Sequence, residues 1–215
     1  MIPNLIVPTL TRYDLLQKML SSIDYPIGHV LIIDNGNMID QLKLPAEIKE
    51  LTVLTMPANL GVASSWNLGI KSFPHDEVWY FVSDDVEFLP GALEAWHEAS
   101  GTDRIVTAEQ WPHYQLFSVG EDVIDRVGLF DEALHPANFE DDDFEWRAAK
   151  QGFDALRVAI DHSHVGQATV FQEGNAEKNA KSYPLNEVYF RYKQSQGDLS
   201  AGEWSLERRR INSWD

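Results

Sequence analysis

A short buried strand that ends in a row of carboxylates constrains this chain most. The segment Val78–Val82 is a run of β-branched and aromatic residues, which is typical of a buried strand. Ser83, Asp84 and Asp85 follow it directly. Because carboxylates crowded at a strand end repel one another, a divalent cation, alone or with a phosphate-bearing ligand, would offset their charge. An acidic turn in a very acidic protein is the alternative that this segment alone leaves open.

Strands and helices alternate through the first half of the chain. Before Val78–Val82 the sequence predicts helices from Asp14 and over Ala63–Ile70, and strands at Asn4–Pro8, His29–Ile33 and Leu51–Thr55. This order predicts an α/β domain with a mostly parallel sheet flanked by helices. Polar residues follow all of these strands: Thr9, Asp34, Asn59, Asp84 and Asp85. Each alone is typical of a turn or cap, but together they favour a shared crevice beyond the strand ends, where open α/β sheets bind ligands.

The second half of the chain continues the pattern. The sequence predicts a fifth apolar segment at Gln115–Val119 and a strand at Arg157–Ile160, and it predicts helices from Pro90, over Val123–Val127 and from about Asp141 to Lys150. His162 and His164 then face the same side of an extended chain. The polar tail carries Tyr183, Val188, Tyr189, Phe190 and Tyr192, which indicates a helix packed back on the core. We therefore expect a main domain over residues 1–169 and a helical extension over 170–215.

Composition limits the classes of function. The 215 residues are 44% hydrophobic, as in a globular protein, and no apolar run approaches the length of a membrane span. The N-terminus lacks the features of a secretory signal, and the absence of cysteine fits a reducing compartment, so we expect a cytoplasmic protein. The net charge of −17 argues against a protein that binds nucleic-acid backbones. It does not exclude a nucleotide whose phosphates a metal bridges.

Several motifs follow one another in an order that resembles a known family. They are VPTLTR at Val7–Arg12, LIIDNGN at Leu31–Asn37, NLGVASSWNLGI at Asn59–Ile70, FVSDDVEF at Phe81–Phe88, GLFDE…FEDDDFEWRAAKQGF at Gly128–Phe153 and HVGQAT at His164–Thr169. Together they resemble the nucleotide-sugar-dependent glycosyltransferases of family 2, which have the GT-A fold. FVSDDVEF stands where that family has its metal-binding D-x-D motif. The first Asp of that motif is Ser83 here, and Asp85 corresponds to the main metal ligand.

The resemblance implies sugar transfer from a nucleoside diphosphate to an acceptor hydroxyl. It implies a Mn²⁺ or Mg²⁺ ion held by Asp85 and His164, with His162 in reserve, because a carboxylate and an imidazole suit such an ion. Asp141 corresponds to the Asp of the family's Glu-Asp pair and is the expected general base. One base acting in a direct displacement implies inversion at the anomeric carbon. The neighbouring carboxylates of Glu140, Asp142 and Asp143 would raise its pKa.

The resemblance also assigns donor and acceptor residues. A UDP-sugar is the favoured donor, and the expected donor-binding residues are Pro8, Thr9, Arg12, Asp34, Asn59, Gly61, Asn67, Ser83 and Asp84. Asp34 would accept the imide N–H of uracil, and Gly61 would allow close backbone approach. Trp111, His113 and Tyr114, with Glu140, are the expected acceptor residues because flat aromatic faces suit sugars. The acceptor is open among a glycan, a protein, a small molecule and a lipid head group, with nucleic acid least favoured.

Two alternatives to a glycosyltransferase remain at this point. A sugar nucleotidyltransferase would need a glycine-rich basic loop after the first strand, and VPTLTRYD has no glycine and one arginine. A catalytically silent relative would bind a nucleotide sugar or a partner protein without transfer. Ser83 favours this silent relative, whereas Asp85, Asp141 and His164 favour an enzyme.

Overall fold

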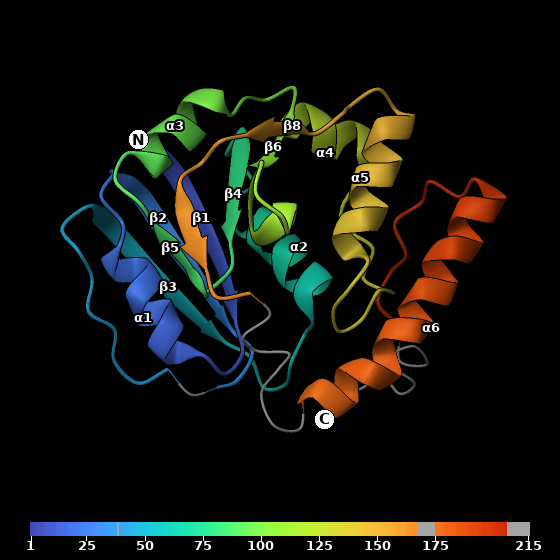
Figure 1. Cartoon of the computed structure of the whole chain (residues 1–215), viewed down its shortest axis with the longest axis horizontal. Helices are drawn as coiled ribbons and strands as arrows, with labels where there is room; N and C mark the ends of the chain where they lie inside the picture. The colour runs from blue at the N-terminus through green and yellow to red at the C-terminus, as the bar shows by residue number, and fades with distance from the viewer. Residues whose placement is uncertain (38, 167–174, 206–215) are drawn as a thin grey trace.

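The computed structural model describes residues 1–37, 39–166 and 175–205. Within these ranges a seven-stranded sheet runs through the centre in the order β3-β2-β1-β4-β7-β6-β8, with helices on both faces (Figure 1). Its strands are β1 (Ile2–Thr9), β2 (Ile27–Asp34), β3 (Ile48–Thr55), β4 (Val78–Val82), β6 (Ile105–Ala108), β7 (Leu116–Gly120) and β8 (Leu156–Val158). The helices are α1 (Tyr13–Ser21), α2 (Val62–Ser72), α3 (Ala92–Ala99), α4 (Glu121–Val127), α5 (Glu140–Lys150) and α6 (Asn175–Gln196). The α/β architecture predicted from the sequence is confirmed.

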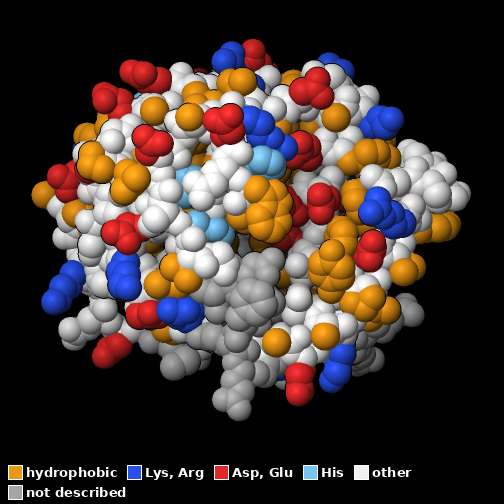
Figure 2. All heavy atoms as spheres, in the orientation of Figure 1, with side chains coloured by type: hydrophobic (Ala, Val, Ile, Leu, Met, Phe, Trp, Pro, Cys, Tyr) orange, Lys and Arg blue, Asp and Glu red, His pale blue; other side chains and the backbone are white. Residues whose placement is uncertain are grey.

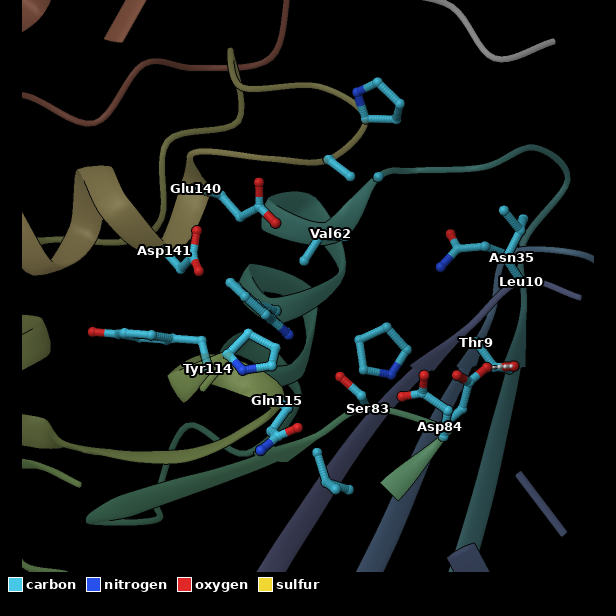
Figure 3. Close-up of a pocket in the computed structure, with 18 of the residues that line it drawn as sticks. Thr9, Leu10, Asn35, Val62, Ser83, Asp84, Tyr114, Gln115, Glu140 and Asp141 are labelled. Atoms are coloured by element: carbon cyan, nitrogen blue, oxygen red, sulfur yellow. Dashed lines mark hydrogen bonds between the residues drawn. The ribbon is translucent and has the colours of Figure 1, made fainter. Parts of the chain in front are cut away.

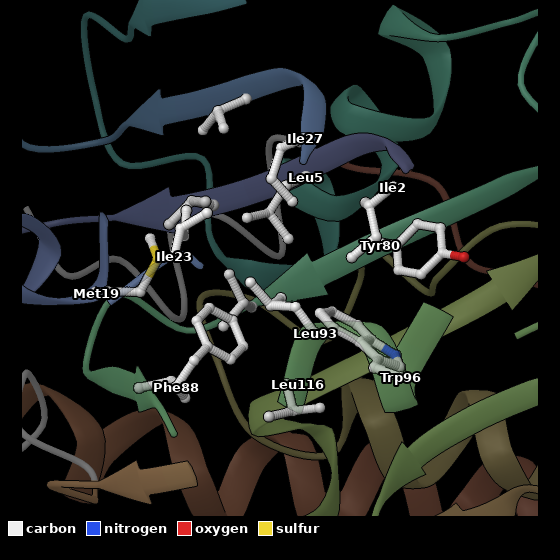
Figure 4. Packing of buried hydrophobic residues seen from close by; sticks show 14 of the residues in the cluster. Ile2, Leu5, Met19, Ile23, Ile27, Tyr80, Phe88, Leu93, Trp96 and Leu116 are labelled. Carbon is white, nitrogen blue, oxygen red and sulfur yellow. The ribbon is translucent and has the colours of Figure 1, made fainter. Parts of the chain in front are cut away.

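Successive side chains of the central strands point to opposite faces of the sheet and pack in two separate hydrophobic cores. On one face α1 and α3 pack over Leu5 and Tyr80 (Figure 4), and on the other face α2, α4 and α5 pack over Ile6 and Phe81. Side chains alternate across a strand, so a strand buried on both faces needs apolar residues at nearly every position. This explains the unbroken apolar runs of β1, β2 and β4. Trp66 of α2 is buried against Phe117 and Phe130.

The sheet is mostly but not wholly parallel. β1, β2, β3 and β4 run parallel to one another, whereas β7 pairs antiparallel with both β4 and β6. The sequence analysis placed an apolar segment at β7 but did not predict β6 or the short strand β5 (Val86–Phe88). These are runs of only four and three residues. Such short segments carry too little periodicity to be distinguished from loops.

A separate two-stranded sheet lies beside the ends of the central strands. It pairs β5 antiparallel with β9 (His162–His164), in the register Val86 with His164 and Phe88 with His162. Phe88 anchors this pair in the core, where its ring stacks at 6.4 Å from Trp96. The pairing brings the two histidines to the residues that follow β4.

Helix α6 is attached to α5 mainly through buried polar contacts. Lys193 of α6 contacts Asp131 at 2.5 Å and Asp143 at 2.7 Å, and Arg147 contacts Asp143 at 2.7 Å. These four side chains, the buried ion cluster, are almost completely inaccessible to solvent. Phe190 is buried, whereas Val188 is 69% and Tyr192 63% exposed, so α6 packs on the core through one face only.

The predicted extension over 170–215 is described for residues 175–205. Asn186 donates to the carbonyl oxygens of His135, Ala137 and Asn138, so α6 also holds the segment that leads into α5. Residues 167–174 and 206–215, which include the end of the HVGQAT motif, lie outside the described residues. The boundary at residue 170 stays a prediction. Among the described helices, none combines the length and the apolar character needed to cross a membrane.

The buried ion cluster gives a test of how α6 is held. We expect Lys193→Met to lower the free energy of unfolding by about 3 kcal/mol, because it leaves two buried carboxylates with one guanidinium. The matched control is Lys181→Met, an exposed lysine of the same helix, which should change stability by less than about 0.5 kcal/mol. Urea unfolding of both variants checks this. Equal unfolding midpoints would contradict the role given to Lys193.

Candidate functional site

A hollow opens at the carboxyl ends of the parallel strands. It has a cavity volume of about 300 Å³. Residues that follow β1, β2 and β4 line one part of it, and the first residues of α2 and α5 line another. Figure 3 shows Ser83 and Asp84 on one side of the hollow and Glu140 and Asp141 on the other. Of the predicted residues it contains Pro8, Thr9, Asn59, Gly61, Ser83, Asp84, Asp85, Tyr114, Glu140, Asp141 and His164.

Asp84 is held at the end of β4 by the end of β1. The Thr9 hydroxyl donates a hydrogen bond to the Asp84 carboxylate at 2.5 Å (dashed in Figure 3), although the residues are far apart in sequence. Burial raises the pKa of Asp84 to about 7, the Thr9 hydrogen bond opposes this rise, and the negative charge of Asp85 adds to it. A carboxylate with this surrounding is stabilised by a nearby cation.

Asp85 and His164 come together through the β5–β9 pair. His164 Nε2 lies 2.9 Å from Asp85 Oδ1, and both side chains are nearly buried and line the hollow. Among the described residues, no group of three or more His, Cys, Asp or Glu side chains is arranged around one metal position. The pair would therefore supply two ligands to a Mn²⁺ or Mg²⁺ ion, which would need further oxygen ligands from elsewhere.

His162, the predicted reserve ligand, is engaged by other groups of the protein. Its Nε2 contacts Gln115 Nε2 and its Nδ1 contacts the Ile160 carbonyl oxygen, both at 2.5 Å, and it does not line the hollow. Because both ring nitrogens already have partners, the structure favours a role for His162 in holding β9. These contacts do not support His162 as a reserve metal ligand.

The first turn of α5 presents two carboxyl groups to the hollow. Burial, and then the charge of Asp142, raise the pKa of Asp141 to about 6, while its Oδ1 accepts a hydrogen bond from the Asp142 backbone N–H. Glu140 is only 6% exposed, and its Oε2 has no hydrogen-bond partner among the described residues. Burial raises the pKa of Glu140 well above its usual range. An unsatisfied buried carboxyl group that faces a cavity is suited to a polar ligand.

Asn59 and Gly61 shape the loop that leads into α2. The Asn59 side chain accepts a hydrogen bond from the Gly61 N–H, and the Val62 N–H donates to the Pro136 carbonyl oxygen at 2.7 Å. A Cβ atom on Gly61 would lie 2.7 Å from that same oxygen. The predicted close backbone approach at Gly61 is therefore to the segment before α5, which forms another wall of the hollow.

Three predicted donor residues do not line the hollow. Asp34 is fully buried, and its carboxylate accepts hydrogen bonds from the Tyr13 hydroxyl and from the N–H groups of Gly36 and Ile39. Asn67 bonds the backbone of Phe130 in both directions, at 2.9 Å each. Arg12 is bound to Asp14. In this structure these side chains stabilise turns and helix packing, which does not support donor contacts for them.

The predicted acceptor residues differ in exposure: one is on the protein surface and another is buried. Trp111 is 73% exposed, whereas Tyr114 is buried and lines the hollow. His113 Nδ1 contacts the Ala108 carbonyl oxygen at 2.9 Å and so fixes this turn to the end of β6. The segment is thus a rigid support that carries one exposed indole ring.

The sequence analysis missed Asn35 and Gln115, which both line the hollow. Asn35 accepts from the Leu60 N–H and donates to the Ser65 hydroxyl, so it joins β2 to α2. The Asp34-Asn35-Gly36 turn is the signal for Asn35, because a polar turn after a strand end marks this edge of the sheet. Gln115 is 2% exposed, and its Oε1 has no hydrogen-bond partner among the described residues. It stood inside an apolar segment and therefore gave no signal.

Comparison with known proteins identifies the fold. The sequence matches no family model and no curated protein. Among solved structures, GalNAc-T7 with UDP, GalNAc and Mn²⁺ is similar over 97% of this chain and 54% of that one, at 10% identity and a TM-score of 0.62. The catalytic domain of Drosophila β1,4-galactosyltransferase 7 with xylobiose is similar over 79% and 72%, at 14% identity and a TM-score of 0.53. S. aureus TarS is similar over 98% and 42%, at 14% identity and a TM-score of 0.55.

This chain has the GT-A fold. The similar proteins are glycosyltransferases of that fold, which confirms the predicted fold class. The chain spans about half the length of the GalNAc-T7 structure and less than half of TarS. At these low identities the comparison establishes the GT-A architecture, and membership of family 2 stays a prediction.

Two glycines test the close approach at the wall of the GT-A hollow. Gly61 has φ 81° and ψ 171°, and Gly128 has φ 85° and ψ −171°, but only at Gly61 would a Cβ atom meet other atoms. We expect Gly128→Ala to cost about 2 kcal/mol of stability from backbone strain. Gly61→Ala should cost about 2 kcal/mol more, because the segment before α5 must move. Thermal and urea unfolding measure the difference, and equal losses would show that the contact with Pro136 does not matter.

Proposed function

We propose that this protein transfers a sugar from a nucleoside diphosphate sugar, with a UDP-sugar as favoured donor, to an acceptor hydroxyl with inversion. The observation that carries this proposal is the convergence of two distant sets of groups on one hollow. Asp84, Asp85 and His164 line it from the strand ends, and Glu140 and Asp141 line it from α5. Charge that develops on a leaving diphosphate and a proton that leaves a hydroxyl need these two kinds of group.

Asp141 is the proposed general base. In the reaction the acceptor oxygen bonds to the anomeric carbon, the bond from that carbon to the diphosphate oxygen breaks, and the acceptor proton passes to Asp141. UDP is the leaving group. A carboxylate whose pKa is raised to about 6 is a stronger base than a solvated one and is still ionised at neutral pH. One base and one displacement give an inverted product.

Asp85 and His164 are the proposed ligands of a divalent cation, Mn²⁺ or Mg²⁺. The bound cation would stabilise negative charge on the diphosphate as a Lewis acid. Asp84 faces the same region, and its hydrogen bond from Thr9 fixes its carboxylate. Ser83, which replaces the first Asp of the family motif, brings a hydroxyl instead of a charge.

The ends of β1 and β2 are the proposed site of the nucleoside. Pro8, Thr9 and Asn35 line this side of the hollow with Asn59 and Gly61. Gln115 and Glu140 line the hollow, and each has a buried oxygen without a hydrogen-bond partner among the described residues, so we assign them to the binding of sugar hydroxyls. The GalNAc-T7 structure with UDP, GalNAc and Mn²⁺ supports a donor of this class, because that protein has the same fold.

Substitution of the proposed base should affect the transfer step but not the binding of UDP. We expect Asp141→Asn to keep UDP affinity and to lower kcat by at least about 100-fold, which is typical of a lost general base. Asp125→Asn on the exposed face of α4 is the matched control and should retain wild-type turnover. In the wild type, kcat/KM should fall about tenfold per pH unit below a pKa of about 6, because protonated Asp141 cannot accept the proton. Wild-type turnover of Asp141→Asn would refute the assignment.

Removal of the proposed cation ligand tests the metal. We expect Asp85→Asn to weaken Mn²⁺-dependent UDP binding by at least about tenfold, because the cation loses a charged ligand. Glu87→Gln, two residues further on and exposed, should leave it unchanged. Calorimetric titration of UDP with Mn²⁺ and with EDTA measures both. If the wild type binds UDP with the same affinity in Mn²⁺ and in EDTA, the metal assignment is wrong.

One assay distinguishes this proposal from the two alternatives. A panel of nucleotide sugars is incubated with Mn²⁺, and release of the nucleoside diphosphate is measured with and without candidate acceptors. Release of diphosphate supports a glycosyltransferase. Binding of a nucleotide sugar without release from any donor would favour the silent relative, and consumption of a nucleoside triphosphate would favour a nucleotidyltransferase.

A further inference from the structure

A second hollow meets the first one at Asp141. It has a cavity volume of about 710 Å³ and is walled by α5, α6 and the segment Trp111–Tyr114. Pro112, Tyr114 and Asp141 line both hollows. A molecule in the second hollow can therefore reach the carboxylate of Asp141 without entering the space at the strand ends.

Aromatic rings from separate parts of the chain line this second hollow. Trp111 is 73% and Tyr183 of α6 44% exposed, so both rings are accessible to a ligand in this hollow. Tyr183 packs at 4.9 Å from the ring of Phe139, and Trp146 of α5 lies at 6.3 Å from Phe190 of α6. In Figure 2 hydrophobic rings and acidic side chains adjoin one another near the middle of this face.

The charged groups of the second hollow do not favour an anion. Asp142 and Glu145 line it together with Asp141. Its arginines are already engaged: Arg157 binds Glu145 and the Thr107 hydroxyl at 2.5 Å each, and Arg191 lies against Glu187 and Gln194. A phosphate, sulfate or uronate ligand would meet carboxylates and would have to displace an existing arginine contact.

Tyr114 supplies a buried polar group at the boundary between the hollows. Its hydroxyl has no hydrogen-bond partner of normal geometry among the described residues. Burial raises the pKa of Tyr114 well above its usual value, and the neighbouring charges of Glu145 and Asp141 add to the rise. The hydroxyl is therefore a neutral donor, placed beside the proposed base.

We infer that the second hollow binds the acceptor and that the acceptor is a neutral saccharide. Sugar rings have apolar C–H faces that stack on aromatic rings and hydroxyl groups that donate to carboxylates, and this hollow offers both. The role of the bound saccharide as acceptor rests on the proposed function, whereas the binding of a saccharide in this hollow does not. The inference also gives α6 a role, because Tyr183 and Phe190 form one wall.

Binding of neutral disaccharides tests the inference directly. Cellobiose, maltose and N,N′-diacetylchitobiose are titrated into the full chain with UDP and Mn²⁺ present, and binding is followed by ligand-observed NMR. A chondroitin disaccharide and a trilysine peptide are the anionic and cationic comparisons. We expect at least one neutral disaccharide to bind and both charged probes to fail. Trp111→Ala and Tyr183→Ala should each weaken binding about tenfold, in line with loss of a stacked ring.

The matched control lies on the same helix. Tyr192 is 63% exposed but does not line the hollow, so Tyr192→Ala should leave disaccharide affinity within about twofold of wild type. UDP affinity should be unchanged in all three variants. Binding by no neutral disaccharide, tighter binding of either charged probe, or equal affinity in all variants would overturn the inference while leaving the donor site intact. Failure of UDP to bind would instead count against the proposed function.

Discussion

The buried ion cluster of Asp131, Asp143, Arg147 and Lys193 is the contact on which the candidate site depends. It lies beneath the first turns of α5, where Arg147 also donates to the carbonyl oxygens of Val127 and Leu129. Charges buried this deeply are costly unless each has a well-placed partner, so the cluster admits few arrangements. It fixes α5 against the core and α6 against α5. The position of Asp141 and the wall formed by Tyr183 both follow from it.

The hollow at the strand ends gathers acid groups that disfavour one another. Burial raises the pKa of Asp84 to about 7 and that of Asp141 to about 6, and it raises the pKa of Glu140 well above its usual range. In a chain with a net charge of −17 this arrangement is unfavourable without a ligand. A cation bound by Asp85 and His164 would offset the negative charge at the strand ends. The raised pKa of Asp141 in α5 would favour its accepting a proton from an acceptor hydroxyl. The same electrostatic strain thus supports both halves of the proposed chemistry.

The sequence predicted the strands that are buried on both faces, because their apolar runs are long, and it predicted that polar residues would meet where those strands end. It could not predict which of two adjacent polar residues faces the hollow. Asp34 is the predicted donor residue, yet its carboxylate accepts a hydrogen bond from Tyr13, whereas Asn35 lines the hollow. His162 and His164 share a strand, but Gln115 binds His162, and Gln115 is distant in sequence. The sequence around Lys193 is typical of an exposed polar helix, and its burial against Asp131 and Asp143 follows only from the position of α6 in the fold.

Magnetic resonance of bound Mn²⁺ tests the central claim most directly. With UDP present, the electron spin-echo signal of Mn²⁺ should show coupling both to a ¹⁴N nucleus of His164 and to ³¹P of the diphosphate. Labelling histidine with ¹⁵N should replace the ¹⁴N coupling, which places protein and nucleotide on one ion. A signal identical to that of Mn²⁺ with UDP in buffer, without nitrogen coupling, would contradict the account, because the cation would then not join the strand ends to the donor.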